Sequence, residues 1–235
     1  MAAHIPGVVF LIDKMELGVL TLMENGLIPK VPVLPPVQTW SEALSALEAL
    51  RVEDHSFRAV AMDAVSGFGL LCREAVCQCQ FSGNWTKYAD YSKGDLIHSP
   101  VEWRLILAAL DRLRLERRMS VMLLGHQRMG NVKGGSKPDY DKNLVDFPKE
   151  MWVLTERWAD LILFADFELT FDDETKKKSK AHGGQTRMLY CENRAEHVAK
   201  NRHGLPPEVE MGNSGAEAWN NLSAALKAGR KGVAA

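Results

Sequence analysis

Three apolar runs in this sequence each lead into a polar side chain: Asp13, Asp63 and His126. In open sheets of parallel strands, ligands bind at the carboxyl ends of the strands. An aspartate in that place holds Mg²⁺ through water beside nucleotide phosphates, because hard cations take oxygen ligands. An aspartate after a strand is also a common turn-forming or helix-capping residue, and a histidine there is often structural. The coincidence of all three favours a nucleotide-type site.

Apolar patterning predicts the elements that position these side chains. Strands are predicted at residues 8–12, 58–63, 121–125 and 161–164, because each range contains an apolar run typical of a buried strand. Helices are expected at residues 40–52, 67–80, from 99 into the basic stretch 112–118, at 150–158, and from 216 onward. Strands that alternate with helices imply right-handed crossovers and an α/β fold with a mainly parallel sheet.

Two of these helices begin with the spacing of a capping box, Thr39 with Glu42 and Ser99 with Glu102. Pro100 stands at the first helical position of the second one, where proline is favoured. The apolar residues that follow recur at helical spacing and predict one buried face, made of Trp103, Ile106, Leu107, Leu110 and Leu113.

Three segments are expected to be connectors or loops. Residues 29–36 hold too many prolines for a helix or a central strand, residues 81–95 are aromatic and polar, and residues 128–143 are glycine-rich and basic. Residues 167–171 and 187–192 are expected to pair as a hairpin around a charged insert. We divide the chain into a core at residues 1–212 and a C-terminal helix with a frayed tail at 213–235.

Composition limits the classes of function. With 46% hydrophobic and 25% charged residues, the 235-residue chain is typical of a globular α/β protein. A formal net charge of -1 means that any contact with DNA needs a local basic surface. No apolar run approaches the roughly 20 residues of a membrane span and no signal core opens the sequence, so we expect a cytoplasmic protein. The four cysteines match no common zinc or disulfide spacing and are expected to be free.

Several of these segments, in this order, resemble the phage nucleotide-binding proteins of the RecA-like P-loop ATPase class, which serve single-strand annealing and recombination. The resemblance runs from about Val8 to Met211. It implies a RecA-like P-loop NTPase core with a mainly parallel sheet and a C-terminal antiparallel hairpin. The matching segments are Phe10–Asp13, Thr39–Glu42, Arg58–Asp63 as the Walker B strand, Met122–His126 as the sensor strand, Trp158–Phe164 and Ala199–Pro206.

The resemblance implies ATP and Mg²⁺ as cofactors, with Asp13 and Asp63 at the nucleotide and Asp63 on the metal. His126 would sense the γ-phosphate. Family members tend to carry a water-activating acid two positions after the residue that corresponds to Asp13. Here that place is Met15, so the general base is expected to be the next residue, Glu16.

Two basic segments are assigned partners on the same ground. Lys200 and Arg202 resemble the trans-acting basic pair of hexameric helicases, which implies a homo-oligomer, a ring or a filament, in which they reach a neighbour's nucleotide. A surface basic turn is the equal alternative. Lys133, Lys137 and Tyr140 occupy the place of the mobile DNA-binding loop and imply a single-stranded DNA partner. A plain surface loop explains them as well.

The phosphate-holding motif of the class is not found in the sequence. No stretch fits G-x-x-x-x-G-K-[ST], whose backbone N–H groups, lysine and hydroxyl hold phosphates and Mg²⁺. We therefore expect that an N-terminal strand, loop and helix are missing, that ATP binds weakly or not at all to this chain alone, and that a second polypeptide supplies the missing piece. The alternatives are a non-catalytic DNA-binding or assembly module and a decayed prophage fragment.

Overall fold

The computed structural model describes residues 1–134, 138–171 and 181–232. The chain forms two compact units. The sheet unit consists of Ala2–Arg128 and Val145–Trp158, and the hairpin unit consists of Met1, Met129–Leu144 and Ala159–Ala235.

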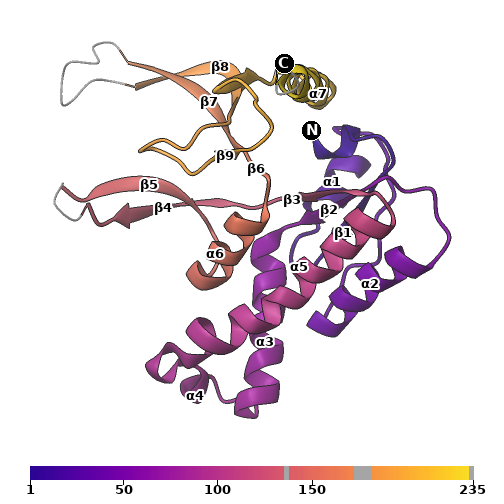
Figure 1. The fold of residues 1–235 in the computed structure, drawn as a ribbon, viewed down its shortest axis with the longest axis vertical. Coiled ribbons are helices and arrows are strands. Elements are labelled where there is room, and N and C mark those ends of the chain that lie inside the picture. The colour runs from indigo at the N-terminus through magenta and orange to yellow at the C-terminus, as the bar shows by residue number, and fades with distance from the viewer. Residues whose placement is uncertain (135–137, 172–180, 233–235) are drawn as a thin grey trace. The chain divides into compact units, whose positions relative to one another are not determined.

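The sheet unit is built on three parallel strands, β1 (Val8–Ile12), β2 (Ala59–Asp63) and β3 (Ser120–Leu123), in the order β1-β2-β3 (Figure 1). Ile12 pairs with Asp63 and Met62 pairs with Leu123, so the three strands end at nearly the same level. Every residue of β1 is buried. The predicted parallel α/β arrangement is confirmed.

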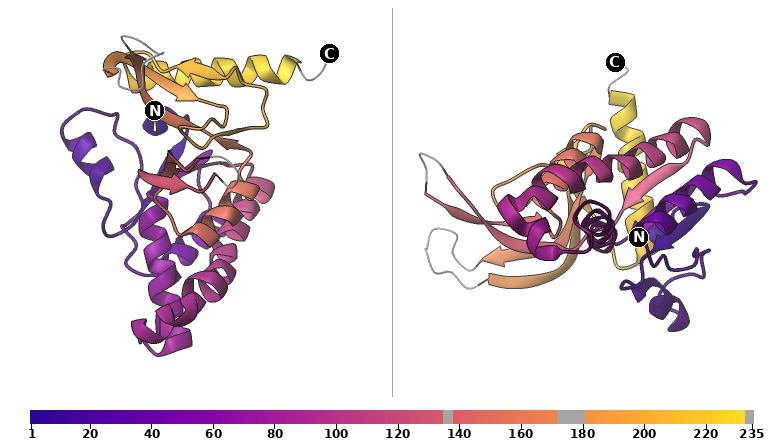
Figure 2. Two further views of the ribbon diagram at one scale, coloured as in Figure 1. Left: turned by 90° about the vertical axis from the view of Figure 1, so that its left-hand side faces the viewer. Right: turned by 90° about the horizontal axis from the view of Figure 1, so that it is seen from below.

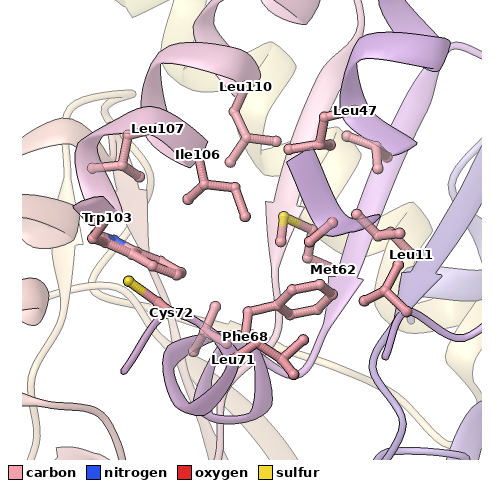
Figure 3. Close-up of a cluster of buried hydrophobic side chains, with 14 of the residues drawn as sticks. Leu11, Leu47, Met62, Phe68, Leu71, Cys72, Trp103, Ile106, Leu107 and Leu110 are labelled. Atoms are coloured by element: carbon pink, nitrogen blue, oxygen red, sulfur yellow. The ribbon is translucent and has the colours of Figure 1, made fainter. Parts of the chain in front are cut away.

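Four helices pack with this sheet: α2 (Trp40–Val52), α3 (Val65–Phe81), α5 (Ser99–Glu116) and α6 (Lys149–Trp158). Alternate strand residues, such as Leu11 and Met62, contribute to the same hydrophobic cluster as the helices (Figure 3). Alternation arises because successive side chains of a strand point to opposite faces. The helices predicted at 40–52, 67–80 and 150–158 are confirmed within a few residues.

The predicted apolar face of α5 is buried along its whole length. Trp103 lies between two other rings, with its centroid 5.8 Å from that of Trp40 and 4.9 Å from that of Phe147. Its indole N–H donates to Thr155 Oγ1 at 2.8 Å, which satisfies a polar group that burial would otherwise penalise.

Of the two predicted capping boxes, the one at Thr39 forms with its reciprocal bond moved from Thr39 to Gln38, and the one at Ser99 does not form. Thr39 Oγ1 accepts from the Glu42 amide at 3.2 Å, and the Glu42 carboxylate accepts from the Gln38 amide at 2.7 Å. The box at Ser99 was wrong, because the π-helix η3 (Gly94–His98) runs directly into α5 and leaves no free helix start. The Ser99 hydroxyl instead bonds Tyr88 Oη at 2.7 Å.

The loop predicted at 81–95 is largely helical and was also wrong. It contains α4 (Trp85–Ala89) and the 3₁₀ turn η2 (Asp90–Ser92), at the end of α3 (Figure 1; turned views in Figure 2). Buried Tyr88 organises this end, because its hydroxyl also bonds Asp95 Oδ1 at 2.6 Å.

The proline-rich connector is irregular but does more than connect. After the short helix η1 (Ala2–His4), β1 and the helix α1 (Gly18–Glu24), it runs parallel to the edge of β1 that β2 leaves open. The Phe10 amide donates to the Pro32 carbonyl at 2.9 Å and the Phe10 carbonyl accepts from Leu34 at 2.8 Å. The Val37 amide donates to Ile12 at 3.0 Å. Residues 32–37 therefore close that edge.

The hairpin unit is mostly antiparallel. β7 (Phe164–Phe171), β8 (Ala181–Tyr190) and β10 (Glu208–Glu210) form one antiparallel sheet in the order β10-β8-β7. A hairpin therefore forms as predicted, but its pairing differs: residues 167–171 pair with 181–187 rather than with 187–192, because β8 begins earlier than expected. The predicted strand at 161–164 is divided between β6 (Leu161–Ile162) and the start of β7, and β6 pairs with β9 (Lys200–Asn201). The C-terminal helix α7 spans Gly215–Gly232.

The segment 128–143 was predicted to be a loop, and this was wrong. It contributes to two strands, β4 (Gln127–Val132) and β5 (Tyr140–Val145), which pair with each other. Mutual pairing satisfies the backbone groups of a sequence that has little apolar alternation.

The state of the cysteines and the hydropathy of the helices were also predicted from composition. The cysteines are free, with Cys72, Cys77 and Cys191 buried and Cys79 exposed. Among the helices of the described residues, none is both long and apolar enough to cross a bilayer.

Candidate functional site

Asp63 closes β2 at the carboxyl end of the parallel sheet. Its pKa is raised to about 6, first by burial and then by the negative charges of Glu16 and Asp13, while His126 acts in the opposite direction. The carboxylate is therefore partly desolvated and surrounded by like charge. A cation at this point would offset both effects.

Glu16 and His126 form a contact beside Asp63. Glu16 follows the turn after β1, where its amide donates to the Asp13 carbonyl at 3.3 Å. His126 lies three residues beyond β3, and its carbonyl accepts from the Asp146 amide at 2.8 Å. Nε2 of His126 is 3.0 Å from Oε2 of Glu16. Both side chains remain accessible, at 60% and 30% exposure.

Asp13 is arranged differently from the other two acids. It is 1% exposed, its Oδ1 accepts from the Met15 amide at 2.8 Å, and its Oδ2 has no hydrogen-bond partner among the described residues. Since Ile12 is the register partner of Asp63, alternation directs the Asp13 side chain to the opposite face of the sheet from Asp63. Asp13 lies instead against Gly67 near the start of α3. Its role as a nucleotide ligand stays a prediction.

Gly67 is the residue of this neighbourhood that sequence reasoning missed. A Cβ at Gly67 would lie 2.0 Å from Asp13 Oδ2, so only glycine leaves room for the buried carboxylate. A signal was present in the sequence, because a glycine within a helical pattern often marks a close approach of another group.

The acid expected at position 15 is replaced by Met15, but the next residue, Glu16, still places a carboxylate at the strand ends. The Met15 side chain is 70% exposed, whereas the Glu16 carboxylate contacts the His126 ring. A turn after the strand permits this, since strict alternation of side chains ends with the extended backbone. The assignment of Glu16 as a general base remains a prediction.

The donor set fits a divalent cation only with help from a ligand. Within the part of the chain that the structure describes, no three His, Cys, Asp or Glu side chains are grouped so as to hold a metal ion. Asp63 supplies the carboxylate oxygen that Mg²⁺ prefers, and Mg²⁺ ordinarily completes its shell with water and substrate phosphates. For the phosphates themselves the sequence has no G-x-x-x-x-G-K-[ST] loop.

The basic residues Lys200 and Arg202 lie in the hairpin unit. Lys200 is in β9, where it pairs with Ile162 of β6. Arg202 is held by Asp160 twice: its amide donates to the Asp160 carbonyl at 3.1 Å, and its Nη1 lies 3.1 Å from Asp160 Oδ1. The ion pair is exposed rather than buried, which leaves the guanidinium accessible.

The residues predicted to bind DNA lie on the β4–β5 hairpin. Lys133 is 84% exposed but its ammonium group is 2.6 Å from Asp139 Oδ2, and this contact lowers the pKa of Asp139. Tyr140 begins β5 and is exposed. Lys137 lies outside the described residues. Asp139 was not anticipated, and it means that a phosphate group would compete with a carboxylate for Lys133.

A protein-family model covers most of the chain. A family model described as "AAA domain" matches residues 18–203, which is most of the chain. The matched range contains Asp63, His126, Lys200 and Arg202, and it begins just after Glu16. No curated protein matches the sequence.

Proposed function

The chain belongs to the AAA domain family of P-loop NTPases, and from that premise we propose that it binds a nucleoside triphosphate with Mg²⁺ at the carboxyl ends of β1, β2 and β3. One observation carries the proposal: Asp63 ends β2 within the electrostatic reach of the Glu16–His126 contact. Ligands of parallel α/β sheets bind at this end of the strands.

In this proposal Asp63 holds the hydrated cation. Bound Mg²⁺ would supply positive charge that neutralises the phosphates. Burial and two neighbouring acids disfavour the deprotonated form of Asp63, so a bound cation would stabilise that form. His126 and Glu16, which are accessible and hydrogen-bonded to each other, are positioned to hold or move a proton beside the phosphates.

The phosphate-holding group is assigned to another polypeptide, because no phosphate-holding loop occurs in residues 1–235. It follows that ATP binds weakly to residues 1–235 alone. A phosphate site completed by another segment also agrees with the proposed homo-oligomer, in which Lys200 and accessible Arg202 act on a neighbour's nucleotide.

The proposed setting is phage DNA recombination or replication with single-stranded DNA, in the cytoplasm of a bacterial host. It is supported by the resemblance of the motifs and by the exposed Lys133 and Tyr140 on one hairpin. Base stacking on an exposed aromatic ring with a nearby lysine is a sequence-tolerant way to bind single strands. Asp139 tempers that affinity, so DNA binding would be weak at physiological salt.

A second candidate function is a non-catalytic DNA-binding or assembly module. The absence of a phosphate loop from the sequence favours it, and so does the incomplete donor set around Asp63. Such a module would bind single-stranded DNA with a strong dependence on salt and none on ATP. A decayed prophage fragment without activity would instead fail to give a monodisperse folded species.

The deciding experiment is Mg²⁺-dependent binding of a labelled ATP analogue to the purified chain, with and without single-stranded DNA. Asp63→Ala is the test variant, and Asp54→Ala, at an exposed position, is the matched control. Binding that Asp63→Ala abolishes and Asp54→Ala retains supports the nucleotide site. If the folded wild-type chain binds DNA but no analogue, even at analogue concentrations that would saturate a weak site, the non-catalytic module is the correct interpretation.

A further inference from the structure

A buried histidine in the hairpin unit is enclosed by two aromatic rings. His197 is 4% exposed, and its ring stacks on Phe164 with a centroid distance of 4.8 Å and an interplanar angle of 5°. The ring of Tyr190 lies 4.9 Å away. His197 Nε2 is 3.1 Å from the Glu192 carbonyl, which is compatible with donation from a neutral ring. The stack therefore fixes the segment 192–197 against the β7–β8 sheet.

The same segment is attached to the β4–β5 hairpin. The Asn143 amide of β5 donates to the Glu196 carbonyl at 2.7 Å, and Asn143 forms a parallel bridge with His197. Lys142, whose side chain is buried, donates from Nζ to Asn193 Oδ1 at 3.0 Å. Two successive residues of β5 thus hold the segment that His197 anchors.

The chain then leads directly into the basic residues of β9. Lys200 is three positions after His197, and Ala199 between them is buried. Lys200 pairs with Ile162, and the Arg202 amide bonds the Asp160 carbonyl. Hydrogen bonds and packing are therefore continuous from β5, through His197, to Arg202.

We infer that His197 is a positioning residue that couples the β4–β5 hairpin to the Lys200–Arg202 segment. The functional consequence of this coupling rests on the proposed function, in which the hairpin contacts DNA and the basic pair acts on a neighbour's nucleotide. The coupling itself is a property of the folded chain. A ligand that orders the hairpin would order Arg202 through the anchored segment.

The charges around His197 make the coupling sensitive to pH. Burial lowers the pKa of His197 below its ordinary value of 6.5, and Lys142 of β5 and Arg194 of its own loop also lower it. The Glu192 carbonyl and the Glu196 carboxylate act in the opposite direction, while Phe164 and Tyr190 bring no charge at neutral pH. Because the folded-state pKa is depressed, the anchoring is complete above pH 6.5 and is lost as pH falls through the folded-state pKa.

The test is amide hydrogen exchange, resolved by residue and expressed as protection factors, on the full chain without nucleotide or DNA. The wild type, His197→Ala and His197→Phe are compared at pH 7.5 and pH 5. In His197→Ala, protection of both the Asn143 and Arg202 amides should fall by about tenfold or more, while the Met211 amide, which bonds the Arg187 carbonyl in the same unit, keeps its protection. His197→Phe, which preserves the stack, should restore most of it and remove the extra loss at pH 5.

Two results would overturn the inference. Loss of protection at Asn143 with none at Arg202 would show that the segment does not transmit order to the basic pair. Equal losses at Asn143, Arg202 and Met211 would show general unfolding of the unit.

A second experiment adds a single-stranded oligonucleotide to the wild type and to His197→Ala. Protection gained at Asn143 and Arg202 in the wild type, but at Asn143 alone in His197→Ala, supports the coupling. An oligonucleotide that changes no amide, with coupling intact in the first experiment, contradicts only the proposed DNA function.

Discussion

The Glu16 carboxylate lies 3.0 Å from the His126 imidazole, although the two residues are 110 positions apart in the chain. The parallel register of β1, β2 and β3 causes this meeting, because it brings the strand ends to one level. The contact is accessible to solvent, and pairs of this kind are worth at most about 1 kcal/mol. The contact therefore contributes little to the stability of the fold, and it brings a carboxylate and an imidazole together at the strand ends.

The Glu16–His126 contact predicts variants that separate chemistry from folding. Glu16→Gln and His126→Ala should each change the free energy of unfolding by less than about 1 kcal/mol, measured by urea denaturation. If the missing phosphate grip is supplied, Glu16→Gln should abolish nucleotide hydrolysis while nucleotide binding persists. Hydrolysis at the wild-type rate in Glu16→Gln would exclude Glu16 as the general base.

The Asp63 carboxyl should make stability fall as pH rises. Its folded-state pKa of about 6 is above the ordinary 3.8, so the stability it contributes is present below pH 3.8 and is lost as pH rises to 6. Asp63→Asn should therefore raise the free energy of unfolding at pH 7.5 by about 1–3 kcal/mol, with a much smaller gain at pH 4. Urea unfolding at the two pH values measures this, and an equal effect at both would contradict it.

Gly67 should not tolerate a side chain while Asp13 is present. Gly67→Ala places a methyl group 2.0 Å from Asp13 Oδ2 and should destabilise the chain by about 1–3 kcal/mol, although alanine is ordinarily better than glycine in a helix. The double variant Asp13→Ala with Gly67→Ala should recover most of that loss, and thermal unfolding of the four proteins gives the coupling. Additive effects would mean that the two residues do not collide.

Asp139 should limit the affinity of the β4–β5 hairpin for single-stranded DNA. Asp139→Asn frees Lys133 and should strengthen binding, whereas Lys133→Ala should weaken it and reduce the slope of log affinity against log salt by about 0.7. Fluorescence anisotropy with a labelled oligonucleotide at several salt concentrations measures both. Arg114→Ala, on α5 of the sheet unit, is a control for the loss of a positive charge outside the hairpin. Identical binding by all variants would remove the hairpin from the DNA proposal.

Much of the sheet unit could be predicted from sequence because its signals are local and mutually consistent. Val8–Ile12 is a continuous apolar run that is buried throughout, and the helical spacing from Trp103 to Leu113 marks a face that is buried. The strand ends could be predicted as a meeting place because parallel strands share a direction. These inferences required only the spacing of apolar residues and the order of the elements along the chain.

The failures arose where tertiary contacts override local preference. Ser99 has the right residues for a cap, but Tyr88 takes its hydroxyl and η3 removes the helix start. Residues 128–143 were predicted to be a loop because the segment is glycine-rich and basic, yet β4 and β5 pair with each other. The Glu16–His126 contact and the pairing of Lys133 with Asp139 depend on turn geometry, which residue types do not specify.

The proline-rich connector also determines how copies of this chain can assemble. Residues 32–37 occupy the second edge of β1, and prolines 32, 35 and 36 have no N–H to offer to a further strand. A fibril grown by edge-to-edge addition needs two open edges on every copy, because each copy must both receive and present a strand. Propagation through the sheet unit would stop at β1, so a filament of this protein cannot be continued through the β1-β2-β3 sheet.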